Sequence, residues 1–216
     1  MSDDAYQRAR SPERKAARRA AILAAAADLL DHGGTEAATL SAIAAGAGMV
    51  KSGIYRYFES REDILIHLLI EGTEDLIAAL EATGPQNGAA GTAAVIAAGF
   101  AARPRLCLLT SEMAPTLERN ISLASLIALK TRMAALFGRA AAAAARIHGA
   151  LSLEAAGTSM LTITALVAGL WPMTTPGPLV AEALDRSGFA AHMVPFEGNL
   201  RRAVHALLLG AEQAAR

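Results

Sequence analysis

One short segment, residues 39–58, constrains the fold more than any other part of the chain. It reads TLSAIAAGAGMVKSGIYRYF, a pattern typical of two short helices joined by a turn. Ala44 is small enough for the second helix to cross close to the first, and Gly48 lies where the turn needs a positive φ, which glycine adopts without strain. Ile43 and Ile54 are apolar at positions that face a shared interior. The segment therefore predicts a helix-turn-helix.

Helical signals flank this segment on both sides. Alanine supplies much of the 53% hydrophobic content, and alanine is the strongest helix former. Ser11-Pro12-Glu13 predicts a helix start, since serine can cap free N–H groups and proline suits the first helical position. That helix should end at Gly33-Gly34, and Ser60 should cap the next long helix in a capping-box pattern. No stretch alternates with the period of a strand, so we expect an all-α protein.

A turn-rich break, TGPQNGAAG at residues 83–91, separates this region from the rest. The remainder of the chain predicts helices alone, at 89–102, 104–118, 122–148, 152–170, 178–187 and 196–214. We expect an N-terminal domain over residues 1–60 and a C-terminal helical domain over 61–216. The first helix of the second domain, 60–82, would connect the two parts rigidly.

The second helix of the motif, expected at about 51–58, carries the polar residues that could contact DNA. In such a motif this helix enters the major groove, and its N-terminal residues meet base edges. Lys51 and Arg56 can donate to guanine or to phosphate, and the tyrosine rings can pack on sugars or a thymine methyl. Phe58 is more consistent with a place in the core. The candidate DNA contacts are Thr39, Ser41, Lys51, Ser52, Gly53, Tyr55, Arg56, Tyr57 and Arg61.

The charge distribution agrees with an anionic partner near the N-terminus. The net charge of the whole chain is zero, but the segment from Arg8 to Arg61 holds nine basic and five acidic residues, a difference of +4. Such an asymmetry points to nucleic acid or another anionic surface.

The stretch AGMVKSGIYRYFESREDIL resembles the signature of the TetR/AcrR family of transcriptional regulators. Residues 15–70 carry this resemblance, and RPRLCLLTSEMAPTLERNIS at 103–122 is similar, more loosely, to a ligand-domain helix of one branch. Val50 departs from the pattern, because many members have serine or threonine there to cap the recognition helix.

The resemblance implies an all-α homodimer with an N-terminal three-helix helix-turn-helix DNA-binding domain and a C-terminal ligand-binding and dimerisation domain. The dimer would form through the helices at 152–170 and 196–214. It would place two recognition helices about 34–36 Å apart on a near-palindromic operator. We therefore expect a cytoplasmic, ligand-responsive regulator, most simply a repressor that a small effector releases from DNA.

The effector itself is indicated only in outline. Nine apolar residues at helical spacing could line a cavity or could belong to the plain core, and as a group they favour an apolar effector. They are Phe100, Leu109, Met113, Leu117, Leu126, Met133, Phe137, Met160 and Trp171.

Other classes of function find little support in the sequence. The five histidines lack zinc-site spacing, no serine or cysteine has a base at recognisable spacing, and glycine-rich phosphate loops are absent, so we expect no enzyme, no metal and no cofactor. The uncharged run 155–181 is broken by three prolines, which favours a buried helix over a membrane span. Cys107 fits a buried thiol better than a redox sensor. The alternative that stays open is a helical module that binds another protein and not DNA.

Overall fold

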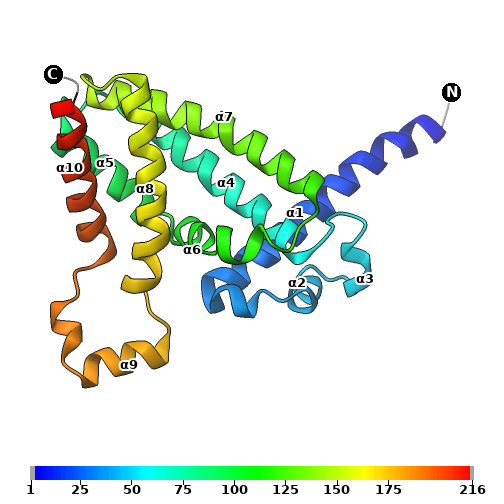
Figure 1. Ribbon diagram of the computed structural model, residues 1–216. Coiled ribbons are helices and arrows are strands. Elements are labelled where there is room, and N and C mark those ends of the chain that lie inside the picture. Colours follow the sequence, from blue (N-terminus) through cyan, green and yellow to red (C-terminus); the bar gives the residue numbers. More distant parts are fainter. Residues whose placement is uncertain (1–2, 215–216) are drawn as a thin grey trace.

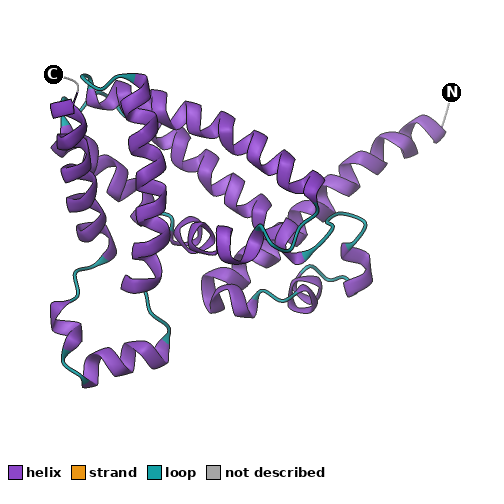
Figure 2. Ribbon diagram, viewed as in Figure 1, coloured by secondary structure: helices purple, strands orange, loops and turns teal. Residues whose placement is uncertain are grey.

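The computed structural model describes residues 3–214, and within that range every regular element is a helix, as the sequence predicts (Figures 1 and 2). The elements are α1 (Asp3–Ala37), α2 (Leu40–Gly46), α3 (Lys51–Ile54), α4 (Arg61–Ala82), α5 (Ala89–Ala101), α6 (Pro104–Glu112), the π-helical turn η1 (Met113–Leu117), α7 (Leu123–His148), α8 (Leu153–Thr174), α9 (Pro178–Arg186), the 3₁₀ turn η2 (Phe189–His192) and α10 (Phe196–Ala214).

Helix α1 begins earlier than the sequence predicts. It starts at Asp3 and runs through Pro12, so the predicted start at Ser11 is wrong. A serine-proline cap signal favours a helix start but does not forbid helix before it, and residues 3–10 include good helix formers. The expected break near the other end is present, because Gly34 has a non-helical backbone with φ 66°.

Helix α4 joins the small N-terminal helices to the rest of the molecule (Figure 1). Its apolar side chains pack on α1 at one end and on α6 and α7 along its length. Arg139 of α7 forms a two-bond ion pair with Glu81, and Arg146 donates to the carbonyl of Leu80 at 2.9 Å. Arg146 thus donates to backbone carbonyls at the C-terminal end of α4, and Arg139 pairs with a carboxylate there.

The region predicted as one helix over 104–118 is divided in two. Helix α6 ends at Glu112, and the five residues of η1 follow, with the N–H of Glu118 donating to the carbonyl of Met113 at 3.0 Å. Pro115 explains the change, because it lacks the N–H that an α-helix would need at that position.

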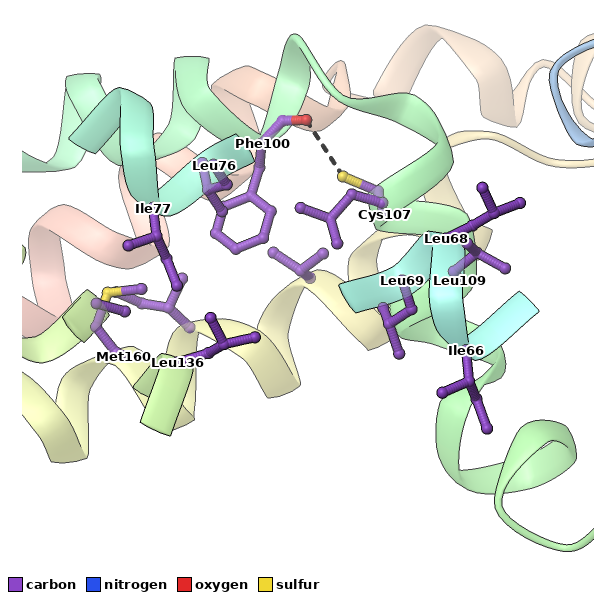
Figure 3. Packing of buried hydrophobic residues seen from close by; sticks show 14 of the residues in the cluster. Ile66, Leu68, Leu69, Leu76, Ile77, Phe100, Cys107, Leu109, Leu136 and Met160 are labelled. Atoms are coloured by element: carbon purple, nitrogen blue, oxygen red, sulfur yellow. Dashed lines mark hydrogen bonds between the residues drawn. The ribbon is translucent and has the colours of Figure 1, made fainter. Parts of the chain in front are cut away.

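Cys107 of α6 is buried in the hydrophobic core (Figure 3). Its Sγ donates to the carbonyl of Phe100 at 3.3 Å, and burial raises the pKa of the thiol to about 12. The buried thiol favoured by the sequence is therefore what the structure contains.

Helices α8 and α10 stand beside each other at the far end of the molecule from α3 (Figure 1). Helix α8 extends to Thr174 through Pro172, four residues beyond the predicted end at 170. Among the described residues, α8 is long and apolar enough to cross a membrane, and the α5–α6 pair, bent by 85°, meets the same criterion as a unit. Helix α8 packs against α6, α7 and α10, but only 28% of its apolar window is buried, so the buried helix that the sequence favours is buried on one side only.

Candidate nucleic-acid interface and effector cavity

The helix-turn-helix is built by local signals in the sequence. Thr39 caps α2, its side chain accepting from the N–H of Ala42 at 3.2 Å, and Gly48 turns the chain with φ 63°. Ile43 and Ile54, buried completely, hold α2 and α3 together. Val50 occupies the N-cap of α3 and provides no side-chain hydrogen bond, as its residue type requires.

The recognition helix is shorter than predicted. Only Lys51–Ile54 are α-helical, and Tyr55, Arg56 and Tyr57 form a hydrogen-bonded turn in place of the expected helix through Phe58. The turn is tight, since the N–H of Tyr57 donates to the carbonyl of Ile54, three residues earlier, at 2.8 Å. A glycine at position 53 and an uncapped start both weaken a four-residue helix.

The predicted DNA contacts divide by exposure. Tyr57, Gly53 and Arg61 are half-buried, and Tyr57 packs partly on the core, while Phe58 is 2% exposed and belongs to the core as expected. The remaining candidates are exposed in α2, in α3 or directly beside them, and they are Thr39, Ser41, Lys51, Ser52, Tyr55 and Arg56.

Arg61 has partners inside the protein. Its Nε donates to the carbonyl of Ala38 at 2.8 Å, one Nη donates to the carbonyl of Thr35, and the other donates to Glu62 at 3.2 Å. The guanidinium therefore ties the end of α1 and the linker before α2 to the first turn of α4. Its role toward phosphate stays a prediction.

The turn at residues 55–57 is called the recognition turn below. Two residues that the sequence did not single out contact this turn or Phe58, which directly follows it. Arg19 of α1 donates to the carbonyl of Tyr57 at 2.8 Å and lies 4.1 Å from the centre of the Phe58 ring. His67 of α4 meets the same Phe58 ring edge-on, with centroids 5.3 Å apart. No local pattern in the sequence marks the contacts of Arg19, because its partners Tyr57 and His67 are 38 and 48 residues away.

The chain also contacts the C-terminal region directly after the recognition turn. The carboxylate of Glu59 accepts from the hydroxyl of Ser125 at 2.8 Å and from that of Ser122 at 3.2 Å. Ser122 is the N-cap of α7, so the start of α7 is joined to the end of the helix-turn-helix.

A small cavity of about 40 Å³ lies in the C-terminal region between α4, α5, α6, α7 and α8. Among the described residues of its wall no side chain is charged, and the hydroxyls belong to Thr73, Thr110 and Thr164, each of which donates to a carbonyl of its own helix. The hydroxyl oxygens still have acceptor capacity. The cavity is therefore apolar, and its polar groups are three threonine hydroxyls that can each accept a hydrogen bond.

Five of the nine predicted pocket residues line this cavity, namely Phe100, Met113, Met133, Phe137 and Met160. The other four lie elsewhere: Leu109 and Leu117 are fully buried, Leu126 packs on the edge of the core, and Trp171 meets Phe196 at 5.1 Å. The cavity wall also contains one face of α4 that was not predicted as pocket, made of Leu69, Thr73, Leu76, Ile77 and Leu80. The three-four spacing along α4 is the signal that could have found it.

Among the residues that the structure describes, no group of three or more histidine, cysteine, aspartate or glutamate side chains is placed to hold a metal ion.

Comparison with known proteins agrees with this arrangement. Residues 22–68 match the model of the bacterial regulatory proteins of the tetR family, and residues 68–215 match that of the tetracyclin repressor-like C-terminal domain. HTH-type transcriptional regulators of Mycobacterium bovis and Mycobacterium tuberculosis are 48% identical over 48 residues, which is 22% of this chain. The match spans about a fifth of the length of these curated relatives, 20%.

Solved structures share the fold over most of the chain. A possible TetR family regulator from Streptomyces coelicolor has a TM-score of 0.61 at 19% identity, covering 92% of this chain and all of that one, 100%. The fatty acid degradation regulator FadR of Bacillus halodurans has a TM-score of 0.53 at 19% identity, covering 88% and 96% of the two chains. Together, the family models, the helix-turn-helix and the helical C-terminal region show that this chain belongs to the TetR family of DNA-binding transcriptional regulators.

Proposed function

We propose that this TetR-family regulator is a repressor that binds a palindromic operator as a homodimer and leaves it when a small, uncharged, apolar effector binds. The observation that carries the proposal is the exposed surface of α2 and α3. Lys51, Ser52, Tyr55 and Arg56 are all exposed in α3 and the turn that follows it, the part of the motif expected to meet the major groove. The location is the cytoplasm, where the protein would reach its DNA.

The dimer would form through α8 and α10. Leu153, Leu161 and Leu209 are 60%, 62% and 41% exposed on these two helices, far from α3. The groove between α8 and α10 is lined mainly by small residues such as Ala155, Gly210 and Ala211, which would permit close approach of a second pair of helices. A two-fold dimer of this kind uses the same surface on both subunits.

The cavity supports an uncharged effector. A charged group would lose its hydration on entering and would meet no opposite charge on the wall. Sites for small ligands have volumes of about 300–1,000 Å³, so the cavity of 40 Å³ would have to widen around its ligand. The effector could then shift the population only by binding the widened state more tightly than the closed one.

Operator binding is tested by selecting duplexes from a random pool and measuring their affinity by gel retardation. A palindrome with half-sites about one helical turn apart is expected. Arg56→Ala is expected to weaken binding, with Arg186→Ala as a matched control on α9, remote from the motif. If Arg56 contacts phosphate, the slope of log affinity against log salt falls by about one unit; if it contacts a base, one position of the operator loses its preference.

Failure to enrich any duplex at low salt would refute the proposed DNA binding and favour the protein-binding alternative. The effector class is tested with matched pairs, such as a medium-chain methyl ester and the corresponding free acid. The ester is expected to raise the melting temperature and release DNA, and the carboxylate is expected to do neither. Release by the carboxylate alone would contradict the uncharged class.

A further inference from the structure

The recognition turn rests on a side chain from α1. Arg19 Nη1 donates to the carbonyl of Tyr57 at 2.8 Å, and the guanidinium carbon lies 4.1 Å from the centre of the Phe58 ring. Its other nitrogen, Nη2, contacts Nε2 of His67 on α4. Arg19 therefore links the end of the recognition turn to two helices, and it holds the backbone at the residue next to Arg56.

The contacts of His67 specify its protonation state. Nδ1 lies 2.7 Å from the carbonyl oxygen of Asp63 and 3.3 Å from its carboxylate, and these oxygens can only accept, so Nδ1 carries the proton. A guanidinium can only donate, so Nε2 must accept from Arg19. The arrangement thus requires the neutral imidazole with its proton on Nδ1.

Protonation of His67 would place an N–H and a positive charge against the guanidinium. The charged groups that face the ring are Asp63 of its own helix and Arg19 of α1, while the turn after α3 presents the uncharged ring of Phe58. The side chain is 35% exposed, so solvent can supply the proton. The hydrogen bond to Asp63 raises the pKa of His67 above its ordinary value, and burial and Arg19 oppose this rise.

We infer that Arg19 is a positioning residue for the recognition turn and that His67 makes this position depend on pH. Neutral His67 holds Arg19 against Tyr57 and Phe58, and protonated His67 repels it. This inference rests on the proposed DNA binding. The DNA-bound state requires neutral His67, so binding releases a proton and weakens as the pH falls through the pKa of His67.

The sign of this effect distinguishes it from general electrostatics. Acidification adds positive charge to the protein, which by itself strengthens attraction to phosphates. In the wild type we expect affinity for a selected operator duplex to fall at least about fivefold from about pH 8 to pH 6, against a limit of about tenfold per pH unit for one linked proton. His67→Gln retains an oxygen acceptor and an amide donor without titrating, and its affinity should not fall over the same range.

A matched control is available on the same domain. His32 lies on the exposed surface of α1, paired with Asp28 and without contact to the recognition turn. His32→Gln should keep the pH dependence of the wild type. Stronger wild-type binding at pH 6, or an equal loss of affinity in His67→Gln, would overturn the inference.

A second measurement needs no DNA. In NMR spectra of the full-length protein, the ring nitrogens of His67, the ring protons of Phe58 and the amide of Phe58, which follows the Tyr57 carbonyl, should titrate with one midpoint. In Arg19→Gln, His67 should titrate with a higher midpoint, since a positive neighbour is gone, and the Phe58 signals should no longer follow it. Titration of His67 that leaves Phe58 unchanged in the wild type would overturn the inference even if DNA binding is confirmed. If no duplex can be selected, the proposed function fails, and the NMR titration still decides whether the contact depends on pH.

Discussion

Phe58 is the residue whose removal should most clearly separate the stability of the helix-turn-helix from its surface chemistry. The ring is 2% exposed, lies 4.1 Å from the Arg19 guanidinium and meets His67 edge-on at 5.3 Å. Truncation of a buried phenylalanine to alanine costs about 3–5 kcal/mol. The loss of the cation–π contact, worth about 0.5–2 kcal/mol, places Phe58→Ala in the upper part of that range. Against a total stability of about 5–15 kcal/mol, this change should be conspicuous.

Urea unfolding followed by circular dichroism measures the change, at a fixed protomer concentration because a dimer's stability depends on it. The matched control is Tyr55→Ala, which removes a ring that is 57% exposed three residues earlier. It should change stability by less than about 0.5 kcal/mol. A loss below about 1 kcal/mol for Phe58→Ala, or equal losses for both variants, would refute the assignment of Phe58 to the core and of Tyr55 to the surface.

Three further predictions each concern a single residue. Gly48→Ala has open space for its methyl group, so only the backbone at φ 63° is strained, and urea unfolding should show a loss of about 1–2 kcal/mol. Cys107, buried and with its pKa raised to about 12, should not react with Ellman's reagent at pH 8 until the protein is unfolded. Arg105→Ala removes two hydrogen bonds that join Arg105 of α6 to Asp31 of α1. Because these side chains are 37% and 42% exposed, the substitution should lower the free energy of unfolding by only about 0.5 kcal/mol at neutral pH. The hydrogen bond from Arg105 lowers the pKa of Asp31, so the ion pair stabilises the fold above the ordinary pKa of Asp31. In urea unfolding at decreasing pH, the difference in stability between the wild type and Arg105→Ala should therefore disappear as Asp31 is protonated.

The parts of the fold that the sequence predicts are those set by neighbouring residues. Thr39, Ser60, Ser122 and Ser152 each cap a helix through their side chains, within three residues of the N–H that they accept from. The positive φ of Gly48 is likewise a local requirement of the turn. Such signals need no tertiary structure, which is why the order and most bounds of the helices can be predicted.

The length of α3 and the start of α1 are harder to predict, because in each case the helix and another backbone conformation differ little in free energy. A helix of four residues gains little from its own hydrogen bonds, so the turn at 55–57 is decided by the burial of Phe58 and by the bond from Arg19. In the same way, Pro115 predicts a break in the helix ladder but not that a π-helical turn will close it.

Arg61 and Arg19 illustrate why the site is harder to predict than the fold. From sequence alone Arg61 is a candidate for phosphate, because it is basic and lies in the first turn of a helix. In the structure its guanidinium donates to the carbonyls of Thr35, at the end of α1, and of Ala38, in the linker before α2, and a phosphate could bind it only by breaking those bonds. Arg19 has no motif around it, yet its partners Tyr57 and His67, 38 and 48 residues away, place it behind the recognition turn. The role of an arginine is set by the acceptors within its reach, and chain topology, not residue type, brings those acceptors to it.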